Sequence, residues 1–159
     1  MSGARTVRLD REIKNFETKS PWGIKCMPEK EDIYDVLIVH MQGPKGSPYE
    51  KGTFKLSITI PKRYPFEPPL VKFETPVYHP NIDKEGRICM DMLKMPPKGA
   101  WLPTITLETL LVSLQTLLAN PNPHDPLMMD IASEYKFDIE RFKQNAKEYT
   151  EKYASGVQV

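Results

Sequence analysis

The sequence has no excess of either charge, because its 22 Lys and Arg residues are balanced by 21 Asp and Glu residues. Binding to the phosphate backbone of nucleic acid usually depends on a marked basic excess, and a solvating tail on a block of acidic residues. No apolar run approaches the length of a membrane span, and the polar N-terminus is unlike a signal peptide. We therefore expect no direct contact with nucleic acid or with a membrane.

Cysteine is also scarce, with only Cys26 and Cys89 in 159 residues. Two cysteines cannot build a disulfide framework, and these two lack the paired spacing of a zinc site. This pattern favours a reducing intracellular compartment. The sequence has no internal repeat, and its length suits one domain with a single core.

Proline, by contrast, is abundant, with 16 residues that lie between apolar segments rather than in one linker. Proline fixes its own φ angle and removes a backbone donor. The four prolines from Pro61 to Pro69 therefore predict a stiff bend. We interpret the prolines as rigid turns of an ordered domain and not as a sign of disorder.

The first half of the chain predicts one helix and then a sheet. Leu9, Ile13 and Phe16 form one apolar stripe in a helix expected around Arg5–Lys19. Four strands are expected after it, from their β-branched and alternating residues, at Gly23–Met27, Tyr34–Met41, Phe54–Ile60 and Leu70–Phe73. The first of them should end at Pro28. Short links between successive strands imply an antiparallel meander.

The second half of the chain predicts helices. Leucines at helical spacing from Leu107 onward indicate the clearest one, with Thr106 as its N-cap. Asp125, followed by proline, is typical of an N-cap and predicts a short helix to about Tyr135, and Asp138 can cap the last helix. A helix, a meander and then helices form an α+β pattern.

A polar, turn-rich loop lies between the two halves, from Tyr78 to Leu93. It holds Pro, Asn, Asp and Gly, and it ends with Cys89 between apolar neighbours. Such a loop is where a scaffold commonly carries chemistry. A buried structural cysteine is the alternative, since free cysteines are among the most buried residues.

Five motifs follow one another in the chain. They are Tyr64-Pro65-Phe66-Glu67-Pro68-Pro69, His79-Pro80-Asn81, Ile88-Cys89-Met90-Asp91, Trp101-Leu102-Pro103 and Asn122-Pro123-His124-Asp125-Pro126-Leu127. Together they resemble the signature of ubiquitin-conjugating enzymes, over about residues 4–154. The resemblance implies a UBC fold with an N-terminal helix, a four-stranded antiparallel meander, an active-site loop and C-terminal helices, in a single domain spanning residues 1–159. It also favours a cis peptide bond between Tyr64 and Pro65.

Residues 47–52 and 93–101, together with the long spacing from Cys89 to Trp101, resemble one subfamily in particular. That subfamily serves the Fanconi anaemia DNA-repair pathway. The resemblance implies monoubiquitination in DNA interstrand cross-link repair, with the Fanconi anaemia ligase subunit as a partner. It also implies a location in the nucleus and cytoplasm.

The resemblance assigns roles to the residues around the loop. Cys89 would carry ubiquitin as a thioester, since a thiolate is both a strong nucleophile and a good leaving group. Asn81 would donate to an oxyanion or hold the loop, and His79 would be a structural hydrogen-bonding residue. Asp125 would orient or deprotonate the incoming lysine or act only as an N-cap, and Asp91 would assist or be a solvated carboxylate.

The same resemblance predicts a surface for RING-type ligases. Arg5, Arg8, Phe66 and Pro103 match it, although the arginines could form a solvated face and Phe66 could belong to the core. Lys94, close to the loop, is a candidate for automodification or an ordinary exposed lysine.

The expected partners are ubiquitin, the ubiquitin-activating enzyme, a RING-type ligase and a protein that supplies the substrate lysine. No bound cofactor or metal is expected, since ATP is used by the upstream activating enzyme. Two alternatives stay open at this point. One is conjugation of another ubiquitin-like modifier, and the other is a non-catalytic binding module of the same fold.

Overall fold

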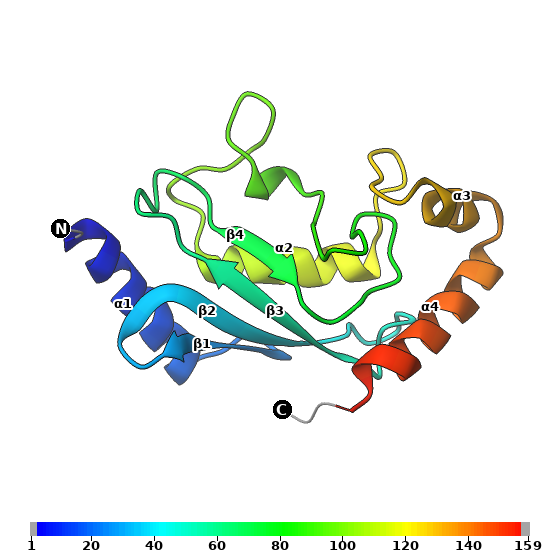
Figure 1. The fold of residues 1–159 in the computed structure, drawn as a ribbon, viewed down its shortest axis with the longest axis horizontal. Coiled ribbons are helices and arrows are strands. Elements are labelled where there is room, and N and C mark those ends of the chain that lie inside the picture. Colours follow the sequence, from blue (N-terminus) through cyan, green and yellow to red (C-terminus); the bar gives the residue numbers. More distant parts are fainter. Residues whose placement is uncertain (1–2, 157–159) are drawn as a thin grey trace.

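A four-stranded antiparallel sheet forms the middle of the computed structural model, which describes residues 3–156 (Figure 1). The strands have the same order in the sheet as in the chain: β1 (Ile24–Lys30), β2 (Ile33–Gln42), β3 (Thr53–Thr59) and β4 (Leu70–Phe73). Around it lie the helices α1 (Gly3–Thr18), the short 3-10 helix η1 (Asp91–Leu93), α2 (Leu107–Ala119), α3 (Met129–Phe137) and α4 (Ile139–Ala154). The α+β prediction is confirmed, while the expected domain limits at residues 1 and 159 lie outside the described residues.

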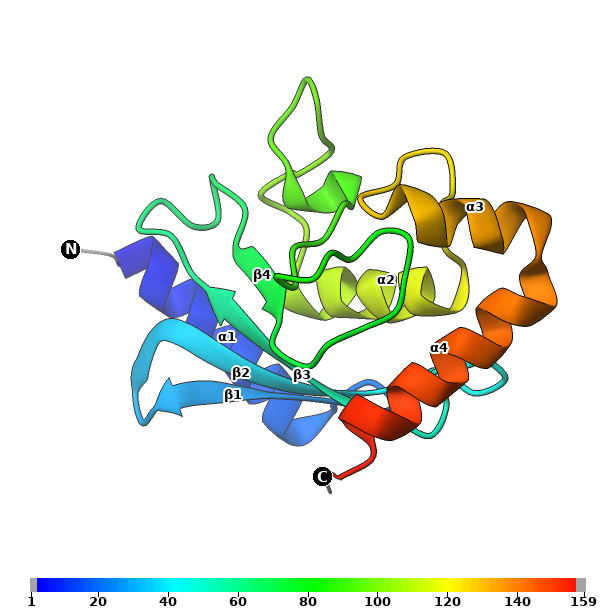
Figure 2. The ribbon, with the colours of Figure 1, turned by 45° about the vertical axis from the view of Figure 1, so that its right-hand side comes forward.

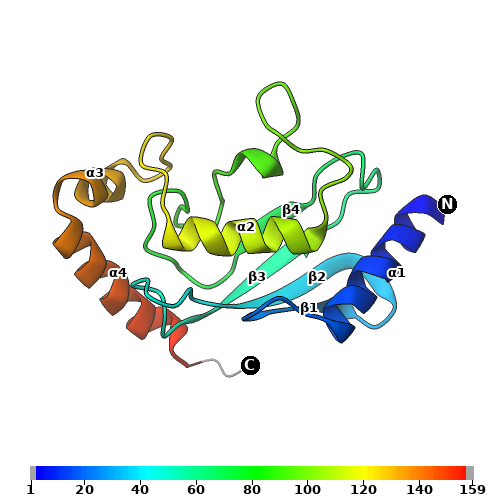
Figure 3. The same cartoon turned by 180° about the vertical axis from the view of Figure 1, so that it is seen from behind.

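The core forms between one face of the sheet and α2. Cys26, Val39, Leu56 and Phe73 pair in register across the four strands, and all of them are buried. The buried leucines of α2 belong to the same hydrophobic cluster. The helix runs behind the sheet in Figure 1 and in front of it in Figure 3. The alternating apolar residues of the strands and the leucine stripe of α2 therefore pack against each other in one core.

The remaining helices lie at the two ends of this core. Figure 2 shows α1 beside β1 and β2, and α3 and α4 at the opposite end of the molecule. The thiol of Cys89, near the end of the polar loop, donates at 3.3 Å to the carboxylate of Asp125, which lies in the loop between α2 and α3. Segments far apart in the sequence therefore meet near Cys89.

Several local predictions are confirmed. The Thr106 side chain accepts a hydrogen bond from the backbone of Thr109, and Asp138 caps α4 in the same way. The Tyr64–Pro65 bond is cis, and the Pro96–Pro97 bond, which we did not predict, is cis as well.

Two predictions of element boundaries are wrong. β1 does not end at Pro28 but continues to Lys30, with a shift of register after the proline. An edge strand with a bulge tolerates proline because no ladder bond needs its missing N–H group. Asp125 does not cap a helix, since α3 begins at Met129. The backbone N–H groups of Leu127 and Met128 donate instead to the Pro80 carbonyl, which keeps this segment beside the polar loop.

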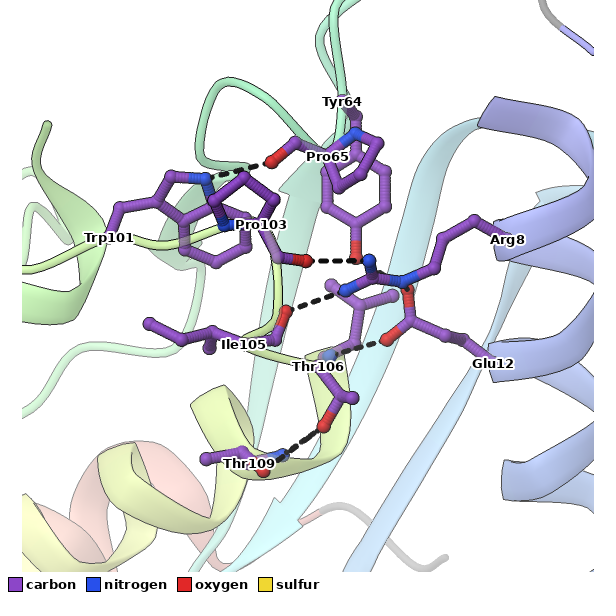
Figure 4. Close-up of polar contacts among 10 residues, drawn as sticks. Arg8, Glu12, Tyr64, Pro65, Trp101, Pro103, Ile105, Thr106 and Thr109 are labelled. Carbon is purple, nitrogen blue, oxygen red and sulfur yellow. Dashed lines mark hydrogen bonds and ion pairs between the residues drawn. The ribbon is translucent and has the colours of Figure 1, made fainter. Parts of the chain in front are cut away.

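Glu12 joins three parts of the fold (Figure 4). It lies among the apolar residues of α1 and is only 7% exposed. Its carboxylate accepts hydrogen bonds from the Tyr64 hydroxyl at 2.5 Å, from the Leu107 backbone at 2.6 Å and from Arg8 at 3.1 Å. Leu107 is the first residue of α2, where an N–H group has no partner within the helix and a negative charge is favourable.

We predict that Glu12→Ala lowers the free energy of unfolding by about 3–5 kcal/mol, because the substitution leaves the partly buried Arg8 and two further donors without their acceptor. Urea unfolding is the measurement. The matched control is Glu17→Ala, at an exposed position of the same helix, which should change stability by less than about 0.5 kcal/mol. Equal losses in the two variants would contradict the role of Glu12.

Candidate active site

Gly86 allows the polar loop to pack closely against the sheet. This residue has a φ of +85°, and a side chain there would come within 1.9 Å of the Phe73 carbonyl oxygen. The Phe73 N–H group donates to the Gly86 carbonyl at 2.9 Å, so the loop extends the edge of β4. The Asp83 carboxylate accepts from the backbone of Glu85 and Arg87 and closes the preceding turn. A glycine is therefore required where the loop touches the sheet.

His79 fastens the start of the loop to α2. Its ring is fully buried, and Nε2 lies 2.8 Å from the Leu117 carbonyl oxygen. Nδ1 accepts from the Asn81 backbone at 3.0 Å. Burial lowers the pKa of His79 to about 4, so the ring is neutral at physiological pH. Both nitrogens are occupied, which leaves no free nitrogen to act as a base.

Asn81 connects this loop to the segment between α2 and α3. Its side-chain Nδ2 donates to the carbonyl oxygens of Asn122 at 2.8 Å and Asp125 at 3.1 Å. Its Oδ1 accepts from the Asn122 backbone at 2.8 Å. The side chain is fully buried and uses both of its amide hydrogens. In this arrangement the amide holds the loop, with no hydrogen left for an oxyanion.

Cys89 lies at the end of this fastened loop and is partly exposed. Its backbone N–H donates to the Asn81 carbonyl at 2.9 Å. Its thiol donates to the Asp125 carboxylate at 3.3 Å, and the Lys94 ammonium lies 3.9 Å from the sulfur. The sulfur is thus placed between an anion and a cation.

The environment raises the pKa of the Cys89 thiol. Burial is the largest cause, and the hydrogen bond to Asp125 acts in the same direction. The Lys94 charge lowers the pKa, whereas the charges of Asp125 and Asp91 raise it. The resting side chain is therefore a thiol at neutral pH, and the lysine is the one of these three charges that favours the thiolate.

Cys26 has a different environment. It lies on the face of the sheet that packs against α2 and is 5% exposed. Burial, the largest cause, and the charge of Glu12, the second, raise the pKa of its thiol to about 12. A thiol buried in this position is not accessible to another protein. Of the two cysteines, only Cys89 combines access with polar neighbours.

Asp91 and Lys94 lie at the base of a closed loop. The Asp91 carbonyl accepts from the backbone of Lys94 at 3.1 Å and of Ala100 at 2.8 Å. The Trp101 backbone donates to the Lys94 carbonyl at 2.9 Å. The loop of residues 94–99 projects away from the sheet in Figures 1 to 3. The Asp91 side chain is exposed, so this residue acts on the site mainly through its backbone and its charge.

A second surface presents apolar side chains at one end of the molecule. Phe66 and Leu102 are 59% and 55% exposed, and Pro103 beside them is exposed as well. The interpretation of Phe66 as a core residue is therefore wrong. The Trp101 indole donates to the Pro65 carbonyl at 3.0 Å (Figure 4). This hydrogen bond joins the loop that carries Phe66 to the loop that carries Leu102 and Pro103.

Arg5 and Arg8 fasten these loops to α1. Arg8 donates to the carbonyl oxygens of Pro103 at 2.6 Å and Ile105 at 2.7 Å (Figure 4). Arg5 donates to the Pro61 carbonyl at 3.0 Å. The Arg5 side chain is only 14% exposed and the Arg8 side chain only 20%. The two arginines are therefore not a freely solvated face.

Sequence reasoning missed two of these residues. Glu12 is detectable as an acidic residue between Leu9 and Ile13 on the apolar stripe of α1. Such a position requires hydrogen-bonding partners. The backbone of Asn122 as the partner of Asn81 has no comparable signal, because the two residues are 41 positions apart.

Residues 3–156 contain neither a metal-binding cluster nor a membrane-spanning helix. No cluster of three or more His, Cys, Asp and Glu side chains there could hold a metal ion. None of the helices in this range combines the length and the apolar content that crossing a membrane requires.

The family model "Ubiquitin-conjugating enzyme" matches residues 8–150. Ubiquitin-conjugating enzyme E2 T of Homo sapiens is 52% identical over 150 residues, which are 94% of this chain and 76% of the human protein. The proteins of the same name from Bos taurus and Danio rerio are 53% and 49% identical, and the aligned residues cover 76% and 77% of those proteins and 94% of this chain.

This chain belongs to the ubiquitin-conjugating enzyme family. Enzymes of the family receive ubiquitin from an activating enzyme and work with a ligase. Ubiquitin, an activating enzyme and a ligase are therefore partners of this chain. The family uses no bound cofactor. Conjugation of ubiquitin is therefore the activity of this chain.

Proposed function

We propose that Cys89 carries ubiquitin as a thioester and passes it to a substrate lysine. The observation that supports this most directly is the partly exposed sulfur between Asp125 and Lys94, at the end of a loop fastened by Asn81. In loading, the Cys89 thiolate attacks the thioester carbonyl carbon on the activating enzyme, whose cysteine leaves as a thiolate. In discharge, the lysine amine attacks the new thioester and the Cys89 thiolate leaves.

We assign to Asp125 the role of accepting the proton of the incoming lysine amine. Its carboxylate accepts the Cys89 S–H in the free enzyme, and the thioester has no such proton. Loading therefore frees the carboxylate beside the reacting carbon, where it can orient the amine and take up its proton. An N-cap role does not compete, because α3 begins at Met129.

The other loop residues have supporting roles in this proposal. Asn81 keeps the Asp125 segment beside Cys89, and His79 keeps the loop on α2. Asp91 closes the loop that bears Lys94. The Lys94 amine, 3.9 Å from the sulfur, is near enough to serve as an acceptor in automodification, forming an isopeptide bond as the Cys89 thiolate leaves.

The exposed apolar surface is the proposed docking site for a RING-type ligase. Phe66 and Pro103 would contact the ligase directly, since both are exposed on rigid, proline-rich loops that lose little entropy on binding. Arg5 and Arg8 would contribute mainly by holding these loops, because their guanidinium groups bind backbone carbonyls of this chain.

We further assign the enzyme to DNA interstrand cross-link repair in the Fanconi anaemia pathway, in the nucleus and cytoplasm. The support is the identity of about half over 94% of the chain to the E2 T proteins, together with the long connection from Cys89 to Trp101. The proposed reaction is monoubiquitination with the Fanconi anaemia ligase subunit as partner.

We predict that Cys89 and not Cys26 forms the thioester. With ubiquitin, the activating enzyme and ATP, the wild type and Cys26→Ser should each give an adduct that reductant removes on a gel. Cys89→Ser should give only a reductant-stable oxyester, because its hydroxyl keeps the position of the nucleophile. A reductant-sensitive adduct in Cys89→Ser would overturn the assignment.

Asp125→Ala should slow discharge to free lysine by about 10²-fold, the lower range for a lost general base. Loading should change by less than about threefold, because removing this hydrogen bond favours the thiolate rather than opposing it. Single-turnover rates of both steps give the comparison. Asp91→Ala, which removes a nearby charge without a contact to the sulfur, is the control. Equal effects of Asp125→Ala on the two steps would mean that the residue serves only the structure.

Phe66→Ala should weaken ligase binding about 30-fold, which corresponds to the loss of a central apolar anchor worth about 2 kcal/mol. Ligase-stimulated discharge should fall accordingly, while loading and free-lysine discharge stay near wild type. Phe137→Ala is the matched control, since Phe137 is 81% exposed at the far end of α3. If Phe137→Ala reduced stimulation as much as Phe66→Ala, the docking surface would be misplaced.

A further inference from the structure

The backbone of Lys94 is held in place near the sulfur. Its backbone N–H donates to Asp91 and its carbonyl accepts from Trp101. A side chain at Gly99 would come within 2.3 Å of the Lys94 carbonyl oxygen, so the end of the loop packs directly against Lys94. The base of the loop is thus closed on both sides of this residue, and its ammonium lies 3.9 Å from Cys89.

The charged groups that act on the sulfur come from three segments. Lys94 favours the thiolate, whereas Asp125 from the segment before α3 and Asp91 from η1 favour the thiol. Burial favours the thiol as well. Lys94 is therefore the positive charge that offsets these influences, and its place in the loop sets the distance over which it acts.

We propose that Lys94, through its positive charge, stabilises the Cys89 thiolate electrostatically. This inference rests on the proposed thioester role of Cys89. The sulfur carries a negative charge at two points, as the attacking group in loading and as the leaving group in discharge. A nearby cation makes the thiolate more abundant before loading and a better leaving group after it. This role differs from automodification, which needs the amine as a nucleophile and not its charge.

The pH dependence of Cys89 alkylation tests the proposal without ubiquitin. Iodoacetamide reacts with the thiolate, and mass spectrometry of the Cys89 peptide gives the rate at each pH. In Lys94→Gln the midpoint should move to higher pH, and the rate at pH 7.5 should fall about two- to fivefold, as for a single exposed charge near 4 Å. Because Lys94 is exposed, 0.5 M salt should reduce the difference.

Two variants separate the charge from other properties of the side chain. Lys94→Arg keeps the charge and removes the nucleophilic amine, so its profile should match the wild type. Lys98→Gln removes an exposed lysine from the same loop and should also match it. The proposal fails if Lys94→Gln matches the wild type, if Lys94→Arg shifts as far as Lys94→Gln, or if Lys98→Gln shifts equally.

Loading and discharge rates complete the test. Lys94→Gln should slow both steps by a similar factor at pH 7.5, and the deficit in loading should shrink toward pH 9.5 as the thiol ionises. If Cys89 did not carry the thioester, charging of Cys89→Ser would reveal that separately. An unchanged alkylation profile with normal charging would sink only the role of Lys94.

Discussion

The site depends on one buried amide. The Asn81 side chain forms three hydrogen bonds to the backbone of the segment between α2 and α3. Together with the backbone hydrogen bonds of Leu127 and Met128 to the Pro80 carbonyl, they hold Asp125 beside Cys89, although the two residues are 36 positions apart in the chain. The amide is fully buried, so an unpaired group there would be costly and the arrangement is strongly favoured. The distance between the carboxylate and the sulfur follows from this constraint.

Both ends of α2 use the same physical device. Its first residue, Leu107, donates its N–H to Glu12, and its near-terminal Leu117 carbonyl binds the His79 ring. Helix ends leave such groups without partners inside the helix. One end therefore anchors the loops of the apolar docking surface and the other anchors the loop of Cys89. A helix of 13 residues, about 20 Å long, thereby links the two proposed functional regions.

Features with a local cause could be predicted from the sequence. The leucine stripe of α2, the alternation in β3 and the caps at Thr106 and Asp138 depend on neighbouring residues. The prediction for Asp125 failed because distant hydrogen bonds to Pro80 decide where α3 begins. Motifs identified the loop of Cys89, but the partners of Asn81, the Glu12 contacts and the place of Lys94 exist only once the chain has folded.

The proposal that Asn81 organises the site, rather than donating to an oxyanion, is tested most directly in Asn81→Ala. Hydrogen exchange of the Asn122 amide should be measured together with the rates of loading and discharge, using amides inside α2 as a reference. We expect faster exchange at Asn122 and a comparable loss in both rates, since the whole site loosens. Unchanged protection at Asn122, with discharge alone about 10²- to 10³-fold slower, would identify a lost oxyanion donor and contradict the proposal.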